Sequence, residues 1–270
     1  MERINTEGLK QIQLEILNVV DDFCKKNDIN YFLSCGTLIG AIRHKGYIPW
    51  DDDIDLGMPR PDYDKFLKTF NDFSDRYKAY SVENNSKIIY PFIKVFDMET
   101  VLYEPDEKGV KTCVNIDVFT YDNAPDNEKK LKKAYRNRDK FVACNNVRTR
   151  LYLTSDNFFK RIIKKIIHPF LLLFPKNFFA KKIVKNSKKY SNIETNKIGN
   201  FMGNSKIYCD KEIINEYIEV EFEGKKYPSP KKYDEWLRAF YGDYMKLPPE
   251  EKRVAHHNFI AYVKEKNEKV

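Results

Sequence analysis

Cysteine is scarce in this sequence and follows no metal-binding pattern. The five cysteines are scattered, their number is odd, and no two of them form a C-x-x-C pair. This spacing argues against a disulfide framework and a zinc site. Long apolar runs are also missing, so no segment is expected to span a bilayer. The N-terminal stretch MERINTEGLKQIQLEIL lacks the basic flank and apolar core of a signal peptide. We therefore expect a reduced, cytoplasmic protein, and the sequence leaves association with a membrane surface open.

Apolar residues are abundant enough to exclude a disordered chain. Of the 270 residues, 42% are hydrophobic and 14% aromatic, which suffices for a packed core in one large domain or two small ones. The 48 Lys and Arg residues exceed the 40 Asp and Glu residues, giving a net charge of +8. This excess suits an anionic partner such as nucleic acid, a membrane surface or a phosphorylated substrate. A lysine-rich genome would produce the same excess, so the location of the positive charge matters more than its sum.

The periodicity of apolar residues predicts alternating helices and strands, which is typical of a mixed α+β fold. An amphipathic helix is expected over residues 6–26, a short buried strand over 29–34, a turn at Gly36 and Thr37, and a short helix over 38–44. A strand over 54–58 and a helix opened by two prolines follow. Further along, we expect several strands between 78 and 119, a charged helix over 125–148, and strands and a helix after residue 200.

Residues 157–190 differ in composition from the rest of the chain. They contain no acidic residue, while lysines alternate with Ile, Leu and Phe. A basic amphipathic segment of this kind is typical of a helix in a membrane interface. A helical hairpin that breaks at His168 and Pro169 and packs on the core would show the same periodicity, so both interpretations stay open. Nucleic-acid binding is not expected, since the aromatic residues are Phe, apart from Tyr190, and no binding motif is present.

Four carboxylates crowd one short stretch, "PWDDDIDLGM": Asp51, Asp52, Asp53 and Asp55. Residues i and i+2 of a strand point to the same face, so Asp53 and Asp55 should project into one pocket while Ile54 packs behind them. Oxygen ligands without His or Cys favour Mg²⁺ or Mn²⁺. Acidic runs are often solvated loops, but apolar residues flank this one, and partly buried carboxylates need a counter-charge. The sequence therefore predicts a metal site here.

Gly36 and Thr37 add a possible phosphate site. A small turn at a helix N-terminus offers free backbone N–H groups and the positive end of the helix dipole. Arg43 and Lys45, at the end of the expected helix, could neutralise phosphate oxygens, although surface charge explains Lys45 equally well. A Gly-Thr pair followed by a D-x-D strand is more specific than either element alone, because the phosphate turn and the metal site would then share one crevice.

A third carboxylate is needed to complete a metal shell or to accept a proton from an attacking hydroxyl. Asp117, between Ile116 and Val118 in the expected strand "VNIDVF", is the preferred candidate, because a buried Asp in a strand is costly unless it is paired. Asp97 and Asp122 are the alternatives, since both lie nearer to predicted turns.

The stretch "GTLIGAIRHKGYIPWDDDIDLGMPRPDYDKF" resembles the LicD family, the bacterial phosphocholine transferases related to fukutin and fukutin-related protein. The similarity is dense over residues 31–66, looser through "FIKVFDMET" and "NIDVFTYD", and returns in "YPSPKKYDEWLRAFYGDYMKLPPEEKR". Residues 157–190 resemble the family least. The resemblance implies one nucleotidyltransferase-like domain over residues 1–270, with a mixed sheet flanked by helices and a basic helical insertion at 157–190. In contrast to fukutin-related protein, this chain is expected to have neither a zinc-binding cysteine set nor an N-terminal anchor.

Carried over position by position, the resemblance assigns roles to individual residues. Asp53 and Asp55 match the metal-binding D-x-D pair, Asp117 the third acidic residue, Gly36 and Thr37 the phosphate-binding turn, and Lys94 a lysine that contacts phosphate. The implied reaction transfers a phospho-alcohol, in the first place phosphocholine, from a CDP-activated donor to a sugar hydroxyl and releases CMP. The acceptor would be a cell-surface glycan or a teichoic acid precursor, often lipid-linked at the inner membrane face.

A choline group would need an aromatic cage, for which the sequence offers several candidates without selecting among them: Tyr31, Tyr47, Trp50, Tyr90, Tyr103 and Trp236. Three alternative functions remain. The same residues could transfer a nucleotide from an NTP, the donor could be CDP-ribitol or CDP-glycerol, or the chain could be a catalytically silent membrane-bound scaffold. The intact carboxylates argue against the scaffold. We assign no role to His256 and His257.

Overall fold

A computed structural model describes residues 2–103, 111–149, 158–254 and 259–264. Its centre is a seven-stranded mixed sheet, in the order β10-β9-β8-β3-β2, with β5 beside β8 and β4 outside β5. The strands are β2 (Phe32–Leu33), β3 (Asp55–Pro59), β4 (Tyr77–Tyr80), β5 (Ile93–Asp97), β8 (Asn115–Ala124), β9 (Lys197–Asn200) and β10 (Ile207–Asp210). Of these pairings only β3 with β8 is parallel. It places Asp55 directly opposite Asp117.

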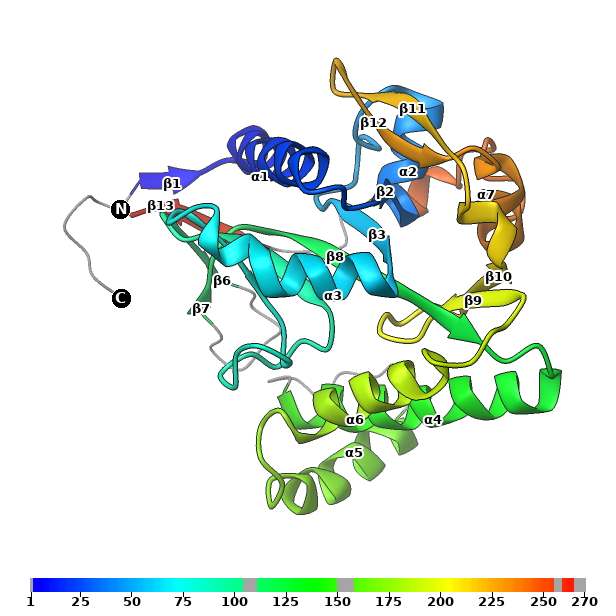
Figure 1. Ribbon diagram of the computed structural model, residues 1–270. Coiled ribbons are helices and arrows are strands. Elements are labelled where there is room, and N and C mark those ends of the chain that lie inside the picture. Colours follow the sequence, from blue (N-terminus) through cyan, green and yellow to red (C-terminus); the bar gives the residue numbers. More distant parts are fainter. Residues whose placement is uncertain (1, 104–110, 150–157, 255–258, 265–270) are drawn as a thin grey trace.

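The described part of the chain contains seven α-helices: α1 (Thr6–Lys26), α2 (Cys35–His44), α3 (Arg60–Thr69), α4 (Glu128–Thr149), α5 (Phe158–Leu171), α6 (Phe178–Ser187) and α7 (Tyr233–Tyr241). Short 3₁₀ turns lie at Phe70–Asp72, Lys188–Tyr190, Lys211–Ile214 and Glu250–Lys252. Helices α1 and α3 both pack on the central sheet. Helices α4, α5 and α6 form a separate layer at the bottom of Figure 1. The expected α+β class is confirmed.

Two smaller sheets complete the fold. β1 (Glu2–Ile4), β13 (Ile260–Val263), β6 (Thr100–Tyr103) and β7 (Lys111–Thr112) form an antiparallel sheet that brings the two ends of the described chain side by side (Figure 1). β11 (Tyr217–Phe222) and β12 (Lys225–Pro230) form a hairpin. Its two turn residues, Glu223 and Gly224, both have positive φ, as a type I′ turn requires.

A core rich in aromatic residues holds these layers together. The rings of Phe23, Phe66 and Phe70 lie 4.6 to 5.7 Å apart and join α1 to α3. Trp236 of α7 is buried against Phe32 and Tyr121, which fixes α7 beside the central sheet. A second, smaller cluster around Leu131, Tyr135 and Phe201 connects α4 to the segment after β9.

Several local predictions are confirmed and two are wrong. The first helix spans Thr6–Lys26 as expected. The helix expected from residue 38 begins earlier, at Cys35, so Gly36 and Thr37 lie in its first turn and not in a turn before it. The expected break at His168 and Pro169 is also wrong, because α5 continues through Pro169 to Leu171. Pro169 lacks the N–H that would bond to the carbonyl of Lys165, so α5 loses one hydrogen bond there and ends two residues later.

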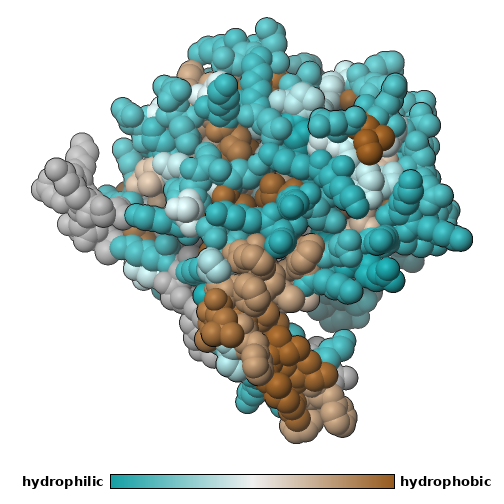
Figure 2. Space-filling model, turned by 60° about the horizontal axis from the view of Figure 1, so that its bottom comes forward, coloured by the Kyte–Doolittle hydropathy of each residue, from teal (hydrophilic) through white to brown (hydrophobic). Residues whose placement is uncertain are grey.

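The basic segment forms α5 and α6. No α-helix of the described residues is both long and apolar enough to cross a membrane. Apolar side chains instead cover a protruding part of the surface, which is brown at the bottom of Figure 2.

Candidate active site

The aspartate run leads into β3 and lines a cleft of about 380 Å³ with three of its carboxylates, Asp51, Asp53 and Asp55. Ile54, between the last two, is fully buried, so the alternation expected of this stretch is present. Carboxylate oxygens of Asp51, Asp52 and Asp53 lie within 4.8 Å of one another, close enough to share one metal ion. Asp51, Asp52 and Asp53 can therefore offer oxygen ligands to one hard divalent cation, although Asp52 lines the neighbouring cavity beside α1 and not this cleft.

Asp55 is held among negative charges. Burial and the neighbouring Asp53, Asp117 and Asp51 raise the pKa of its carboxyl group well above the usual range. Burial and Asp53 likewise raise the pKa of Asp51 to about 7. A bound cation would relieve both effects, because opposite charge favours the ionised form of a carboxyl group. The residues present thus fit a divalent metal.

The first turn of α2 organises this cluster through Gly36 and Thr37. The backbone N–H of Asp55 donates to the Thr37 hydroxyl over 2.8 Å, and the Thr37 side chain is buried. A Cβ on Gly36 would lie 2.6 Å from Oδ2 of Asp51. Glycine thus lets the Asp51 carboxylate approach the helix N-terminus, where the helix dipole favours an anion.

Cys35 and Tyr241 belong to the site, and sequence reasoning missed both. Cys35 has a φ of 47°, unusual for a residue other than Gly, Asn or Asp. Its sulfur lies 3.6 Å from the Ser34 hydroxyl, and its thiol affects the pKa of both Asp55 and Tyr241. Burial and the charge of Asp55 raise the pKa of this thiol, so Cys35 stays neutral and can donate to the carboxylate. Its position directly before the Gly-Thr pair was the only sequence signal.

Asp117 and Lys94 form an ion pair at one side of the cluster. The Lys94 ammonium lies 2.7 Å from Oδ1 of Asp117 and 3.0 Å from the Asn115 side-chain oxygen. It also lies 4.8 Å from the centre of the Tyr90 ring, within cation–π range. Lys94 and Asp117 line a neighbouring cavity of about 190 Å³. The lysine expected to contact phosphate is thus positioned at the third predicted carboxylate.

Arg43 lies at the opposite end of α2 from the carboxylates. Its guanidinium donates to the backbone carbonyl of Tyr244 over 2.7 Å and to the ring of His44 over 2.8 Å. Lys45 is exposed and adopts a left-handed conformation that ends the helix. Neither residue lines the 380 Å³ cleft, so the structure does not bring these two cations to the cluster.

The alternative carboxylates Asp97 and Asp122 are fully buried and paired with arginines elsewhere. Asp97 accepts from Arg76 over 2.7 and 3.0 Å. Asp122 accepts from Arg60 over 2.6 and 2.8 Å. Such two-point contacts satisfy both oxygens of a carboxylate and supply the counter-charge that a buried acidic residue needs.

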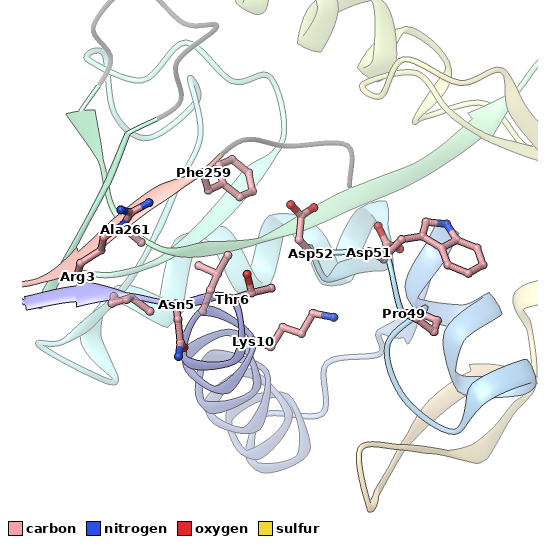
Figure 3. Close-up of a pocket in the computed structure, with 12 residues that line it drawn as sticks. Arg3, Asn5, Thr6, Lys10, Pro49, Asp51, Asp52, Phe259 and Ala261 are labelled. Atoms are coloured by element: carbon pink, nitrogen blue, oxygen red, sulfur yellow. The ribbon is translucent and has the colours of Figure 1, made fainter. Parts of the chain in front are cut away.

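Trp50 borders two cavities. It lines the 380 Å³ cleft and also a cavity of about 520 Å³ on the side of α1 and β13. Figure 3 shows this second cavity, with Asp51 and Asp52 on its right, Arg3 on its left, and Lys10 reaching from α1 toward the side of Asp51 and Pro49. Positive side chains facing a carboxylate cluster across a hollow would suit an anionic group that also binds a metal.

The structure reduces the candidates for an aromatic cage. Tyr31, Tyr47 and Trp236 are buried in the core, and Tyr103 lies on β6 away from the cleft. Trp50 and Tyr90 remain, each half-buried in a cavity wall beside predicted site carboxylates. His256 and His257 lie outside the described residues.

A distant segment closes the cleft and was not predicted. Its residues Asn200, Gly203, Asn204 and Ser205 line the same cleft as the carboxylates. The side-chain oxygen of Asn200 accepts from the backbone N–H groups of Met202 and Gly203, which fixes the course of the segment. Asn204 lines both the 380 and the 190 Å³ cavities. "MGNS" reads as an ordinary turn, so the sequence alone gave no reason to place it here.

Comparison with known proteins gives independent information. The profile described as "LicD/FKTN/FKRP, nucleotidyltransferase domain" matches residues 28–103. A protein of Haemophilus influenzae named "Lipopolysaccharide cholinephosphotransferase LicD" is 37% identical, over 94% of this chain and 98% of its own length. An uncharacterized protein of Rickettsia prowazekii is 36% identical over a stretch that covers 23% of this chain and 24% of that protein. An uncharacterized protein of Rickettsia typhi is 34% identical over a stretch that covers 26% of this chain and 22% of that protein.

Proposed function

The chain belongs to the LicD family, and from that premise we propose that it transfers phosphocholine from CDP-choline to a sugar hydroxyl and releases CMP. The acceptor is a lipid-linked precursor of a cell-surface glycan, either lipopolysaccharide or teichoic acid. Similarity over nearly the whole chain to a lipopolysaccharide cholinephosphotransferase supports this assignment. The observation that carries it is the carboxylate cluster at the cleft: Asp51, Asp53 and Asp55 line it, and burial together with the charges of Asp53, Asp117 and Asp51 raises the pKa of Asp55.

In this proposal Asp53, Asp55 and Asp117 hold Mg²⁺ or Mn²⁺, and Asp51 and Asp52, whose carboxylate oxygens lie within 4.8 Å of those of Asp53, are close enough to take part. The oxygen-only ligand set and the raised pKa of Asp55 support it. When bound, the cation would offset the charge of the donor diphosphate and of the departing CMP. Positioning and charge stabilisation dominate this kind of phosphoryl transfer.

Asp117 orients the acceptor hydroxyl, and Lys94 positions Asp117 through their ion pair. The hydroxyl oxygen forms a bond to the phosphorus of the phosphocholine group, the bond from that phosphorus to the CMP oxygen breaks, and the hydroxyl proton passes to a carboxylate and then to water. Trp50, half-buried in the wall of the cleft, offers its ring to the trimethylammonium group of choline. The Thr37 hydroxyl keeps Asp55 in place by accepting a hydrogen bond from the Asp55 backbone N–H.

The test is release of CMP from CDP-choline with Mg²⁺ or Mn²⁺, with water or a simple hexose as acceptor. CDP-ribitol and CDP-glycerol are run in parallel, and pyrophosphate release is followed with CTP and ATP. Asp53→Asn should abolish CMP release. Asp75→Asn, the same change at a solvent-exposed aspartate, is the matched control and should leave it unchanged.

Each outcome decides between the alternatives. CMP from CDP-choline that depends on metal and on Asp53 supports the proposal. CMP from CDP-ribitol or CDP-glycerol alone would change the alcohol, and pyrophosphate alone would make the chain a nucleotidyltransferase. No product and no stabilisation by any of these ligands would leave the scaffold interpretation.

A further inference from the structure

Helix α5 exposes its apolar half to solvent. Its large apolar residues recur at positions that share one side of a helix, and all of them are exposed: Phe158, Phe159, Ile162, Ile163, Ile166, Ile167 and Phe170. Within α5, only Lys164 and His168 are half-buried, and only Leu171, its last residue, is buried. Since α5 packs on α4, the helix turns its polar side to the protein and its apolar side outward.

Helix α6 has a similar composition but the opposite arrangement. Its apolar residues Phe179, Ile183 and Val184 are buried, while Lys181 and Lys185 are exposed. Packing on the core therefore explains the amphipathic pattern of α6 and does not explain that of α5.

The apolar surface of α5 continues into the turn that follows it. Leu172, Leu173 and Phe174 are exposed, with Leu173 at 82%, and Figure 2 shows apolar side chains running along this protruding part of the molecule. We call these exposed residues of α5 and the turn the α5 face. A contiguous surface of exposed large apolar side chains such as this one marks an interaction site.

Positive charge borders the α5 face. Lys160, Arg161, Lys165 and Lys176 are all exposed, and residues 157–190 contain no Asp or Glu. The partner should therefore be apolar at its centre and anionic around it. A second copy of the chain fits poorly, because a symmetric dimer through this face would bring the same cations together.

We propose that the α5 face binds the surface of an anionic lipid bilayer. The apolar side chains enter the boundary between headgroups and acyl chains, and the bordering cations contact lipid phosphates. With 14 residues, α5 is about 21 Å long, short of the roughly 30 Å hydrocarbon core, so it lies along the membrane plane.

Helix α4 connects the α5 face to the candidate active site. It packs against α5, and its residues Val142, Asn145, Asn146 and Thr149 line the 190 Å³ cavity that also contains Asp117 and Lys94. A protein bound through α5 would thus hold this cavity close to the membrane, where a lipid-linked acceptor lies. This last step rests on the proposed function, whereas lipid binding itself does not.

The test is co-sedimentation of the full chain with phosphatidylcholine vesicles, with and without phosphatidylglycerol, at low and high salt. The chain should bind the anionic vesicles at low salt and bind neutral vesicles much more weakly. The triple variant Phe159→Ser, Ile163→Ser, Ile166→Ser should lose binding about tenfold or more. These side chains are exposed, so the variant should melt like the wild type.

A second variant separates the contribution of the cations to lipid binding from that of the apolar side chains. Lys160→Gln, Arg161→Gln, Lys165→Gln should weaken binding to anionic vesicles by on the order of 100-fold, because each cation near an anionic surface contributes roughly fivefold. Its binding to neutral vesicles should not change.

Matched controls lie away from the α5 face. Lys211→Gln, Lys226→Gln, Lys246→Gln removes the same charge from exposed positions, and Ile193→Ser, Met245→Ser, Val254→Ser removes exposed apolar groups. Both controls should bind like the wild type.

Binding should also persist in Asp53→Asn, which separates this proposal from the proposed function. Wild type that stays in the supernatant with anionic vesicles at low salt would overturn the proposal, as would α5 variants that sediment like the wild type. A dimer in analytical ultracentrifugation that the Ser variant abolishes, without vesicle binding, would make the partner a second copy.

Discussion

At the scale of single residues, the site depends on how closely Asp51 approaches Gly36. Outside its own helix and among the described residues, a Cβ at position 36 would meet only Asp51, with Oδ2 at 2.6 Å and Cγ at 3.7 Å. The carboxylate is the end of a movable side chain, so a larger residue would displace it without disturbing the backbone. Position 36 therefore affects the geometry of the cluster more than the stability of the fold.

Gly36→Ala should separate activity from stability. Alanine favours the helix over glycine by about 0.5–1 kcal/mol, so the melting temperature should hold or rise slightly. Transfer should fall by on the order of 100-fold, since small displacements of catalytic groups are costly. When Asp51 is already replaced by Ala, Gly36→Ala should reduce transfer much less than it does in the wild type. The same reduction in both backgrounds would contradict the explanation.

The raised pKa of Asp51 makes the metal-free protein sensitive to pH. An unfolded Asp titrates near 3.8, and the folded one near 7, so between these values the folded state binds more protons. The free energy of unfolding then falls as pH rises from about 4 to 7. Urea denaturation with EDTA should show this slope, and saturating Mg²⁺ or Asp51→Asn should flatten it. If neither Mg²⁺ nor Asp51→Asn changes the slope, the pH dependence arises from other titratable groups.

At the scale of secondary structure, one hydrogen bond joins α2 to β3. The Asp55 N–H donates to the buried hydroxyl of Thr37, so the helix that carries Gly36 and the strand that carries Asp55 are fixed to each other. The Thr37 side chain thus helps to set the position of the carboxylates relative to the helix N-terminus, beside the backbone hydrogen bond from the Ser34 N–H to the Asp55 carbonyl.

Thr37→Val should break this connection with almost no change of shape. The unpaired Asp55 N–H should lower the free energy of unfolding by about 1–3 kcal/mol, and transfer should fall as Asp55 loses its position. Thr37→Ser keeps the hydroxyl and should retain most of the activity. Urea denaturation measures the loss of stability, and CMP release measures the loss of activity. If Thr37→Ser loses as much stability and activity as Thr37→Val, the hydrogen bond is not the cause.

Helices α5 and α6 offer a matched pair of isoleucines. Ile183→Ala in α6 removes a side chain that is 1% exposed and should cost about 2–5 kcal/mol. Ile163→Ala in α5 removes one that is 54% exposed and should change stability by less than about 0.5 kcal/mol. Urea denaturation of both variants without lipid checks this, and a large loss at Ile163 would mean that α5 packs on the protein.

At the scale of the whole molecule, the cleft is built from segments far apart in the sequence. The first turn of α2, the aspartate run, residues 200–205 and Tyr241 at the end of α7 all contribute to it. A ligand in this cleft contacts all of these segments at once, so its binding should stabilise the entire fold.

Mg²⁺ with CDP-choline should therefore raise the melting temperature of the protein. At 100 times the dissociation constant, binding adds about 2.7 kcal/mol, which for a chain of this size corresponds to roughly 5–10 °C. The shift should require both components and disappear in Asp53→Asn, while Arg43→Gln should keep it because Arg43 lies at the far end of α2. A shift with CTP or ATP alone would favour nucleotidyl transfer.

The sequence by itself determined the features that depend on neighbouring residues. The extent of α1, the placement of Asp53 and Asp55 around a buried Ile54, and the α+β class all follow from local periodicity, because side-chain direction repeats every 3.6 residues in a helix and every two in a strand. The family, too, was identified from one continuous motif.

Only the tertiary structure decided which distant groups meet. It paired Asp97 and Asp122 with arginines, placed Lys94 on Asp117, brought residues 200–205 to the cleft, and turned the apolar side of α5 outward while burying that of α6. Periodicity along a chain shows that a helix has an apolar side, but not what that side contacts. The contact depends on how the whole chain packs, which no local stretch of sequence contains.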